Sequence, residues 1–168
     1  MKGIFAVDPG KKSGVAWAIV DERSETVATA LQNKKHSGSC TVEGTEMEQA
    51  LELFNFWQQF KTGCVVKHHL DPDDIVLVIE DFSLLPGAHS GGKEGVSPAR
   101  IGWAFEGYRQ GRGDKFRKAK HVTEAVWQLP GAMRNKKHLK NWDCWVVGRE
   151  HERAAFCHLG ERLRKLMR

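Results

Sequence analysis

Two short apolar runs, each ending in a carboxylate, constrain this chain more than any other feature. Residues Gly3 to Val7 lead directly into Asp8, and the run Ile75-Val76-Leu77-Val78-Ile79 leads into Glu80. The length and β-branched content of the second run are typical of a strand buried on both faces. Functional groups of α/β sheets gather at the carboxyl ends of the strands. If these two strands are neighbours, Asp8 and Glu80 therefore converge.

A converging pair of carboxylates needs a proton or a cation between the two groups, because like charges a few ångströms apart repel. Hard oxygen ligands favour magnesium or manganese. A purely structural interpretation is also open, in which Asp8 caps the turn at Pro9-Gly10 and Glu80 simply ends a strand. Each residue taken alone favours the structural interpretation, whereas the two together favour a metal site.

Further strand patterns indicate an α/β fold with a mixed sheet. We expect strands over Ser13–Val20, Thr26–Leu31 and Lys118–Trp127 in addition to the first two, which makes five. A short connection between the first two strands favours a hairpin, so the sheet is not wholly parallel.

Helical patterns lie between the strands. Thr45 and Glu48 have the spacing of a capping box. We expect this helix to bury a face of five apolar residues: Met47, Leu51, Phe54, Trp57 and Phe60. Three more helices are predicted: from Ser97-Pro98 to about Gln110, over Asn135–Trp142, and over Glu150–Leu166.

Size and composition fit one soluble domain over residues 1–168. Apolar residues make up 40% and charged residues 28% of the chain. No apolar run is long enough to cross a bilayer, and Asp8 comes too early for a signal-peptide core, so we expect a cytoplasmic protein. The four cysteines match no zinc template and are expected to be reduced, structural thiols.

The charge favours an anionic partner. The net charge is +5 and the isoelectric point is about 9.1, and nucleic acid is the commonest partner of such proteins. The basic residues are also clustered, although clusters alone fit solvated faces equally well.

The terminal helix carries a third candidate group. His151, Ala154, Ala155 and His158 share one helical face. The two small alanines would let this face lie close against the sheet, with His151 within reach of the carboxylates. The alternative is that His151 is a surface histidine.

Four segments, in a fixed order, resemble those of one nuclease family. They are Gly3-Ile4-Phe5-Ala6-Val7-Asp8-Pro9-Gly10 with Ser13-Gly14-Val15-Ala16-Trp17; Val78-Ile79-Glu80-Asp81-Phe82; Ser97-Pro98-Ala99-Arg100-Ile101-Gly102 with Trp127-Gln128-Leu129-Pro130; and the terminal His151 to Ala155, which is similar to an H-x-x-D-A helix. The family is that of the RuvC-type Holliday junction resolvases, in the RNase H-like nuclease superfamily, and the resemblance is to its phage-encoded branch.

This resemblance implies an RNase H-like three-layer fold with a mixed five-stranded sheet flanked by helices. It implies a homodimer that cuts branched double-stranded DNA by two-metal-ion hydrolysis, with two Mg²⁺ or Mn²⁺ ions per active site and no nucleotide cofactor. Asp8, Glu80 and His151 correspond to the metal ligands. For a phage protein, the cytoplasm would be that of the host.

One catalytic position departs from the family pattern. Ala154 stands where the family has its last catalytic Asp, and an alanine cannot bind a metal. Three explanations are open: an engineered Asp-to-Ala change, which the otherwise intact site favours; a natural relative that only binds DNA; or replacement by Glu150, one turn earlier on the same face.

Further expectations concern DNA contacts and rival functions. Phe82 or Trp103 could stack at a junction, although core packing is favoured for both. The helical face of Ile101, Phe105 and Tyr108 is either a dimer face or buried within the monomer. A non-catalytic branched-DNA-binding protein is the alternative function, and an actin-like ATPase is disfavoured because the chain is too short. The expected phosphate contacts are Lys34, Lys35, Arg112, Arg117, Lys118, Lys120, Lys136 and Lys137.

Overall fold

A mixed four-stranded sheet is the centre of the structure, a computed structural model that describes residues 1–79, 97–111, 136–145 and 147–167. The strands are β1 (Lys2–Asp8), β2 (Ser13–Val20), β3 (Lys35–Val42) and β4 (Ile75–Ile79), in the order β3-β2-β1-β4. β1 is antiparallel to β2 and parallel to β4.

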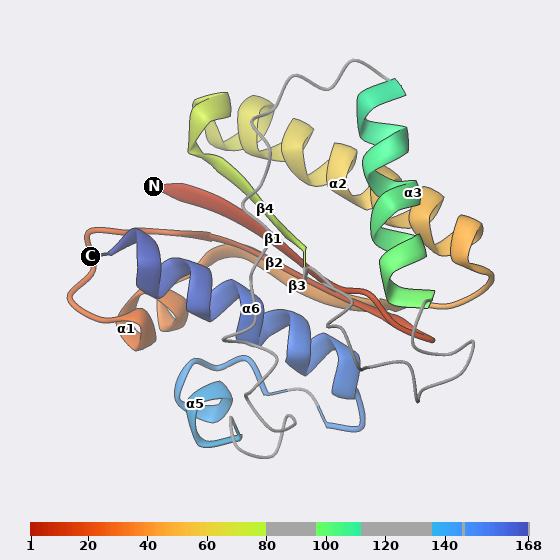
Figure 1. Ribbon diagram of the computed structural model, residues 1–168. Coiled ribbons are helices and arrows are strands. Elements are labelled where there is room, and N and C mark those ends of the chain that lie inside the picture. Colours follow the sequence, from red (N-terminus) through yellow and green to blue (C-terminus); the bar gives the residue numbers. More distant parts are fainter. Residues whose placement is uncertain (80–96, 112–135, 146, 168) are drawn as a thin grey trace.

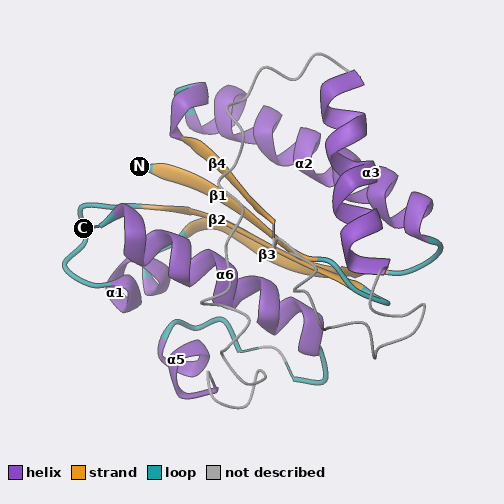
Figure 2. Cartoon of the chain, viewed as in Figure 1, coloured by secondary structure: helices purple, strands orange, loops and turns teal. Residues whose placement is uncertain are grey.

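Helices cover both faces of this sheet and give three layers (Figures 1 and 2). On one face lie α2 (Glu46–His68) and α3 (Ser97–Gly111). On the other lies α6 (Glu150–Leu166), with the short helices α1 (Val27–Gln32) and α5 (Lys136–Asn141) beside it. A 3-10 turn over Pro72–Asp74 leads into β4.

Alternation along the strands divides the core in two. In β1, Ile4 and Ala6 pack in the cluster of α6, whereas Phe5 and Val7 pack in the cluster of α2. All four are at most 1% exposed. β1 is thus buried on both faces, as a strand between two helical layers must be.

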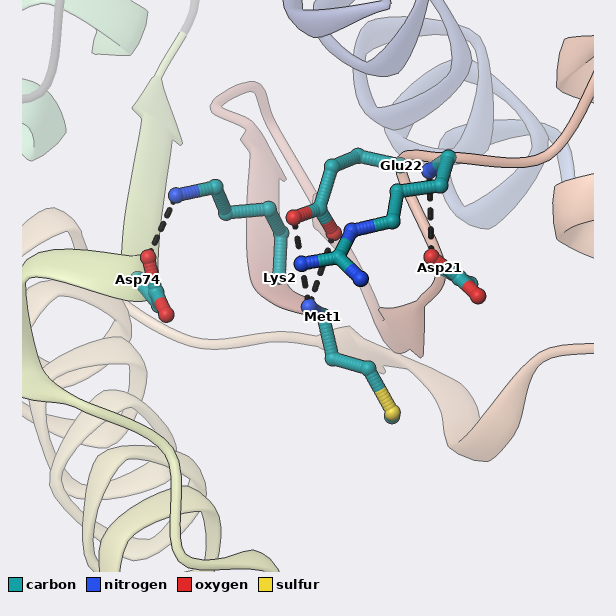
Figure 3. A network of polar contacts seen from close by, with 6 residues as sticks. Met1, Lys2, Asp21, Glu22 and Asp74 are labelled. Carbon is teal, nitrogen blue, oxygen red and sulfur yellow. Dashed lines mark hydrogen bonds and ion pairs between the residues drawn. The ribbon is translucent and has the colours of Figure 1, made fainter.

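The start of β1 is tied to its neighbours by ion pairs (Figure 3). The amino group of Met1 lies 2.9 Å from Glu22, beyond the end of β2, and Lys2 pairs with Asp74, just before β4. These contacts lie at the end of the strand away from Asp8, so they fix the register of β1 without involving that residue.

The α2 helix confirms the predicted capping box and corrects the predicted buried face. The side chain of Thr45 accepts from the Glu48 backbone, and the Glu48 side chain accepts from Thr45. Met47 and Leu51 are exposed, however. At 100° per residue, these two side chains point about 80–120° away from the side chain of Trp57, which lies at the centre of the buried face of the helix. The stripe that is buried consists of Ala50, Leu53, Phe54, Trp57, Phe60 and Cys64.

The predicted strand over Thr26–Leu31 is wrong. This segment forms α1, because the Thr26 side chain accepts a hydrogen bond from the Thr29 backbone and caps a helix there. The third strand is instead Lys35–Val42, an edge strand whose polar sequence, KHSGSCTV, hid it from a search for apolar alternation. The described residues contain four strands rather than the predicted five, and the expected strand over Lys118–Trp127 lies outside them.

The other elements agree with the sequence. The strands over Ser13–Val20 and Ile75–Ile79 and the helix over Glu150–Leu166 are confirmed, and α3 and α5 match their predictions to within a residue. In α3, Ile101 and Phe105 are buried against α2, so that face belongs to the monomer core. Trp103 is 67% exposed, which contradicts core packing for this residue, and Phe82 lies outside the described residues.

All four cysteines are free thiols, and three of them are buried. Burial raises the pKa of the Cys64 thiol to about 12 and that of Cys144 to about 11. Among the helices of the described ranges, none combines the length and the apolar character needed to cross a membrane.

Candidate functional site

Asp8 ends β1 at the edge of the sheet where the parallel strands β1 and β4 both terminate. Val7 pairs with Ile79, the last residue of β4, so the two strands are neighbours. Convergence of the carboxylates at their ends was expected on this condition. Glu80, the next residue, lies outside the described residues. The position of Asp8 agrees with the general location of functional groups in α/β sheets.

Two histidines of α6 contact the Asp8 carboxylate. His151 Nδ1 lies 3.5 Å from Oδ2, and His158 Nε2 lies 3.6 Å from Oδ1. They are seven residues apart, which places both on the same side of the helix after two turns. His151 is partly open, with 38% of its side chain exposed, whereas His158 is 2% exposed. One oxygen of Asp8 thus faces the rim of the site and the other faces its interior.

The environment of His151 raises its pKa above the ordinary value of 6.5. The hydrogen bond to Asp8 is the main cause, the partial burial of the ring opposes it, and the negative charges of Asp8 and Glu150 add to the increase. Protonation of His151 therefore strengthens its interaction with Asp8.

Gly14 allows α6 to reach Asp8. It stands opposite Asp8 in the β1–β2 ladder. A Cβ on Gly14 would collide with the backbone carbonyl of His151 and crowd the backbone nitrogen of Glu152. The first turn of α6 therefore rests directly on the sheet beside Asp8. Ala155 is fully buried, in agreement with the predicted close approach of this helix face, while Ala154 is partly buried.

A buried carboxylate attaches the same turn to β3. Glu152 is fully buried, accepts hydrogen bonds from Ser39 Oγ (2.5 Å) and Thr41 Oγ1 (3.0 Å), and pairs with Arg149 at 3.1 Å. Sequence reasoning did not single out Glu152, because a glutamate in the first turn of a helix is ordinarily a solvated charge. The Arg149–Glu152 spacing of three residues was the one available signal.

The structure brings together some of the predicted site residues. Asp8 and His151 meet, and Ala154 follows His151 by three residues on the same helix. Glu150, the proposed substitute ligand, is exposed at the start of α6. His158 and Gly14 were missed as site residues, although His158 was identified as sharing the face of His151.

The predicted phosphate contacts are dispersed. Lys34 is only 10% exposed, and its ammonium donates to the carbonyls of Trp142 (3.5 Å) and Asp143 (3.1 Å), so its charge is used within the chain. Lys35 is exposed at the end of β3 away from Asp8, since it pairs with Ile19. Two further lysines, Lys136 and Lys137, are exposed on α5, and the remaining four residues lie outside the described residues: Arg112, Arg117, Lys118 and Lys120.

The donor set at Asp8 fits one side of a divalent-ion site. A carboxylate from β1 and an imidazole from α6 converge there. Carboxylate oxygens are typical ligands of magnesium and manganese, and imidazole is a ligand of first-row transition metals. Within the described ranges, no group of three or more His, Cys, Asp or Glu side chains is arranged to hold an ion without further donors. Completion of the set would require a donor such as Glu80.

Comparison with known proteins gives a fold and no sequence family. No protein-family model and no curated protein sequence matches the chain. Among solved structures, T. thermophilus RuvC, in complex with a Holliday junction substrate, matches with a TM-score of 0.52 and 11% identity over 99% of this chain and 96% of that one. The chain therefore has a RuvC-type, RNase H-like α/β fold.

Proposed function

We propose that this protein is a metal-dependent nuclease of branched DNA whose activity is weakened or abolished by Ala154. The observation that supports this most is the meeting of Asp8 with His151 at the carboxyl end of β1, in a fold shared with a RuvC that is bound to a Holliday junction. The net charge of +5 favours the same polyanionic partner. The phage-encoded branch remains an expectation from the sequence resemblance.

In the proposed mechanism, Asp8, Glu80 and His151 would hold Mg²⁺ or Mn²⁺, with two ions per site. Bound divalent ions supply Lewis-acid stabilisation of charge and lower the pKa of a water nucleophile in phosphodiester hydrolysis. The chain's own part is to fix geometry. β1 holds Asp8, the close contact at Gly14 sets the height of α6 above the sheet, and α6 directs His151 to the outer oxygen of Asp8.

Ala154 is the reason to expect little activity from this chain. It follows His151 by three residues, so a side chain there extends from nearly the same face of α6. A methyl group supplies no oxygen, and a two-metal site that lacks one carboxylate binds its ions less tightly. This observation also favours the second candidate function, a branched-DNA-binding protein that does not cut.

Cleavage of a labelled four-way junction in magnesium or manganese tests the proposal. We expect Ala154→Asp to cut, and the original chain and the uncharged control Ala154→Asn to cut at least a hundredfold more slowly. Asp8→Asn in the Ala154→Asp background should remove the gained activity. Cutting by the original chain at the same rate as Ala154→Asp would show that another group, such as Glu150, is the ligand.

Binding separates the two candidate functions. A nuclease and a binding protein should both prefer the four-way junction to a linear duplex of the same length. Preference for the junction without cleavage by any variant supports the non-catalytic function. Absence of any DNA binding at low salt contradicts both.

A further inference from the structure

The first turn of α6 contains an ion pair whose two ends lie in different environments. The side chain of Glu152 is fully buried, and the side chain of Arg149 is 58% exposed. Burying a carboxylate is unfavourable unless donors surround it. Here Ser39 donates to one oxygen of Glu152, and Thr41 and Arg149 donate to the other. The carboxylate is thereby fixed to β3, and it in turn restrains the arginine.

This arrangement prepares the guanidinium for a second partner. An arginine on a surface ordinarily loses much side-chain entropy when it is held in one position. At Arg149 a buried, immobile acceptor already provides that restraint. A guanidinium has five N–H donors in a planar fork, so one edge can donate to Glu152 while another faces an anion.

The strand register puts this guanidinium close to Asp8. Asp8 pairs with Gly14, and Gly14 pairs with Thr41, so the three residues form one row across the sheet. The first turn of α6 lies along that row, with His151 beside Asp8 and Glu152 on Thr41. Thr41 is two strand spacings from Asp8, roughly 10 Å. A nucleic-acid strand that lies at Asp8 therefore passes near Arg149.

We infer that Arg149 contacts a backbone phosphate of the DNA strand at Asp8, and that Glu152 is the positioning residue that aligns it. This inference rests on the proposed function. Arg149 was not among the basic residues that the sequence singled out, because it stands outside the lysine and arginine clusters and is followed directly by Glu150. What distinguishes Arg149 is its ion pair with the buried carboxylate of Glu152, and not the number of basic residues near it in the sequence.

The test measures the affinity for a labelled four-way junction over a range of salt concentrations without divalent ions. We expect Arg149→Gln to weaken binding about tenfold and to reduce the slope of log K against log salt by about one, as the loss of one phosphate contact does. Arg149→Lys keeps the charge and should keep most of the slope. The matched control is Arg164→Gln, on the same helix, which removes a similar pair with Glu161 and should change neither quantity.

Glu152→Gln separates positioning from simple charge. The loss of a negative charge alone would tighten binding to DNA, whereas the loss of the restraint on Arg149 should weaken it. In the Arg149→Gln background the restraint is already lost, so Glu152→Gln should no longer weaken binding. Thr41→Val, which removes a single donor to the carboxylate, is the milder variant if Glu152→Gln melts below the temperature of the assay, and it should weaken binding in the same direction.

The outcomes distinguish this inference from the proposed function. If the original chain binds no DNA, both are wrong. If it binds the junction and Arg149→Gln binds with the same affinity and slope, Arg149 has only a structural role and the proposed function stands. Tighter binding by folded Glu152→Gln or Thr41→Val would overturn the positioning role.

Discussion

His151 and His68 show how one residue type acquires opposite properties from its surroundings. The pKa of His151 is raised, chiefly by its hydrogen bond to Asp8. The pKa of His68, at the end of α2, is lowered by desolvation and by the positive charges of His36, Lys67 and other neighbours. A carboxylate favours the protonated ring, and cations disfavour it. Near neutral pH, His151 is therefore the more strongly protonated of the two in the metal-free protein.

A nuclear magnetic resonance titration of the metal-free protein should show this difference. We expect His151 to titrate above 6.5 and His68 below it, and Asp8→Asn to lower the pKa of His151 without affecting His68. Because the folded pKa of His151 is raised, its contribution to stability is full below pH 6.5 and is lost as the pH rises through the folded pKa. A His151 pKa that is unchanged by Asp8→Asn would exclude the pairing.

At the scale of elements, the docking of α6 depends on a position that has no side chain. Gly14→Ala should push the first turn of α6 off the sheet, because its Cβ would meet backbone rather than a flexible side chain. We expect a loss of about 1–3 kcal/mol in the free energy of unfolding, the usual cost of overpacking. Urea denaturation measures this loss, and the His151 pKa should fall toward its ordinary value as the contact with Asp8 is lost.

Gly63→Ala is the matched control. Gly63 lies within α2, and a Cβ there meets no atom within 4 Å. Alanine should therefore stabilise the helix by up to about 1 kcal/mol. Equal effects of the two substitutions would mean that backbone entropy, and not the approach of α6, determines the requirement for glycine at position 14.

The elements that could be predicted from the sequence are those whose pattern depends on burial. β4 and α6 were predicted with their observed bounds, because one is a continuous apolar run and the other a long periodic helix. β3 could not be predicted, because an edge strand needs few apolar residues and its pairing with β2 is a tertiary effect. α1 was mistaken for a strand because Thr26, Val27 and Thr29 are residue types that are common in strands. The signal for a helix was Thr26, which can act as an N-cap.

The same distinction applies to the candidate site. Asp8 was found because it ends an apolar run, and His151 because it shares a helical face with small residues. Gly14 and Glu152 were not found, because their roles depend on contact between α6 and the strands β2 and β3, which are far away in the sequence. Such contacts follow from the packing of layers, to which local patterns contribute little.

At the scale of the whole molecule, exposed apolar side chains on α2 and α3 are consistent with the homodimer that the sequence resemblance implies. Met47, Leu51 and Trp103 are exposed, and the starts of the two helices are joined by an ion pair between Glu46 and Arg100 at 3.6 Å. Large exposed aromatic residues are frequent anchors of interfaces. A two-fold dimer would suit the symmetric strands of a four-way junction.

Sedimentation equilibrium tests the dimer. We expect Trp103→Ser to weaken association by about 2 kcal/mol, roughly thirtyfold in the dissociation constant. Val147→Ser removes an apolar residue that is still more exposed, from the loop before α6, and should have no effect. A protein that stays monomeric at all concentrations would contradict the dimer. Equal effects of the two variants would mean that Trp103 is not an anchor of the interface.

Thiol reactivity reports on the integrity of both core halves. Cys64 lies in the cluster of α2 and Cys144 in that of α6, and burial raises their pKa values to about 12 and about 11. Cys40 is partly buried, with a pKa of about 11 that reflects desolvation and the nearby carboxylates of Glu152 and Glu52. At pH 8 at most about one such thiol in a thousand is ionised, so these three should react slowly with iodoacetamide until the chain unfolds. Rapid modification of Cys64 or Cys144 in the folded protein would contradict this packing.

The two halves of the candidate site come from opposite ends of the sequence, and this has a consequence for synthesis. Asp8 leaves the ribosome early, whereas His151 and His158 are translated after every other described element of the fold. At 5–20 residues per second the interval is about 7–30 s. Throughout that time one face of the sheet, including Ala6 and Ala16, lacks the helix that buries it. In a chain without α6, Asp8 would therefore lack its contacts with His151 and His158. Under the proposed function, such a chain would not bind metal until α6 had been made and had packed on the sheet.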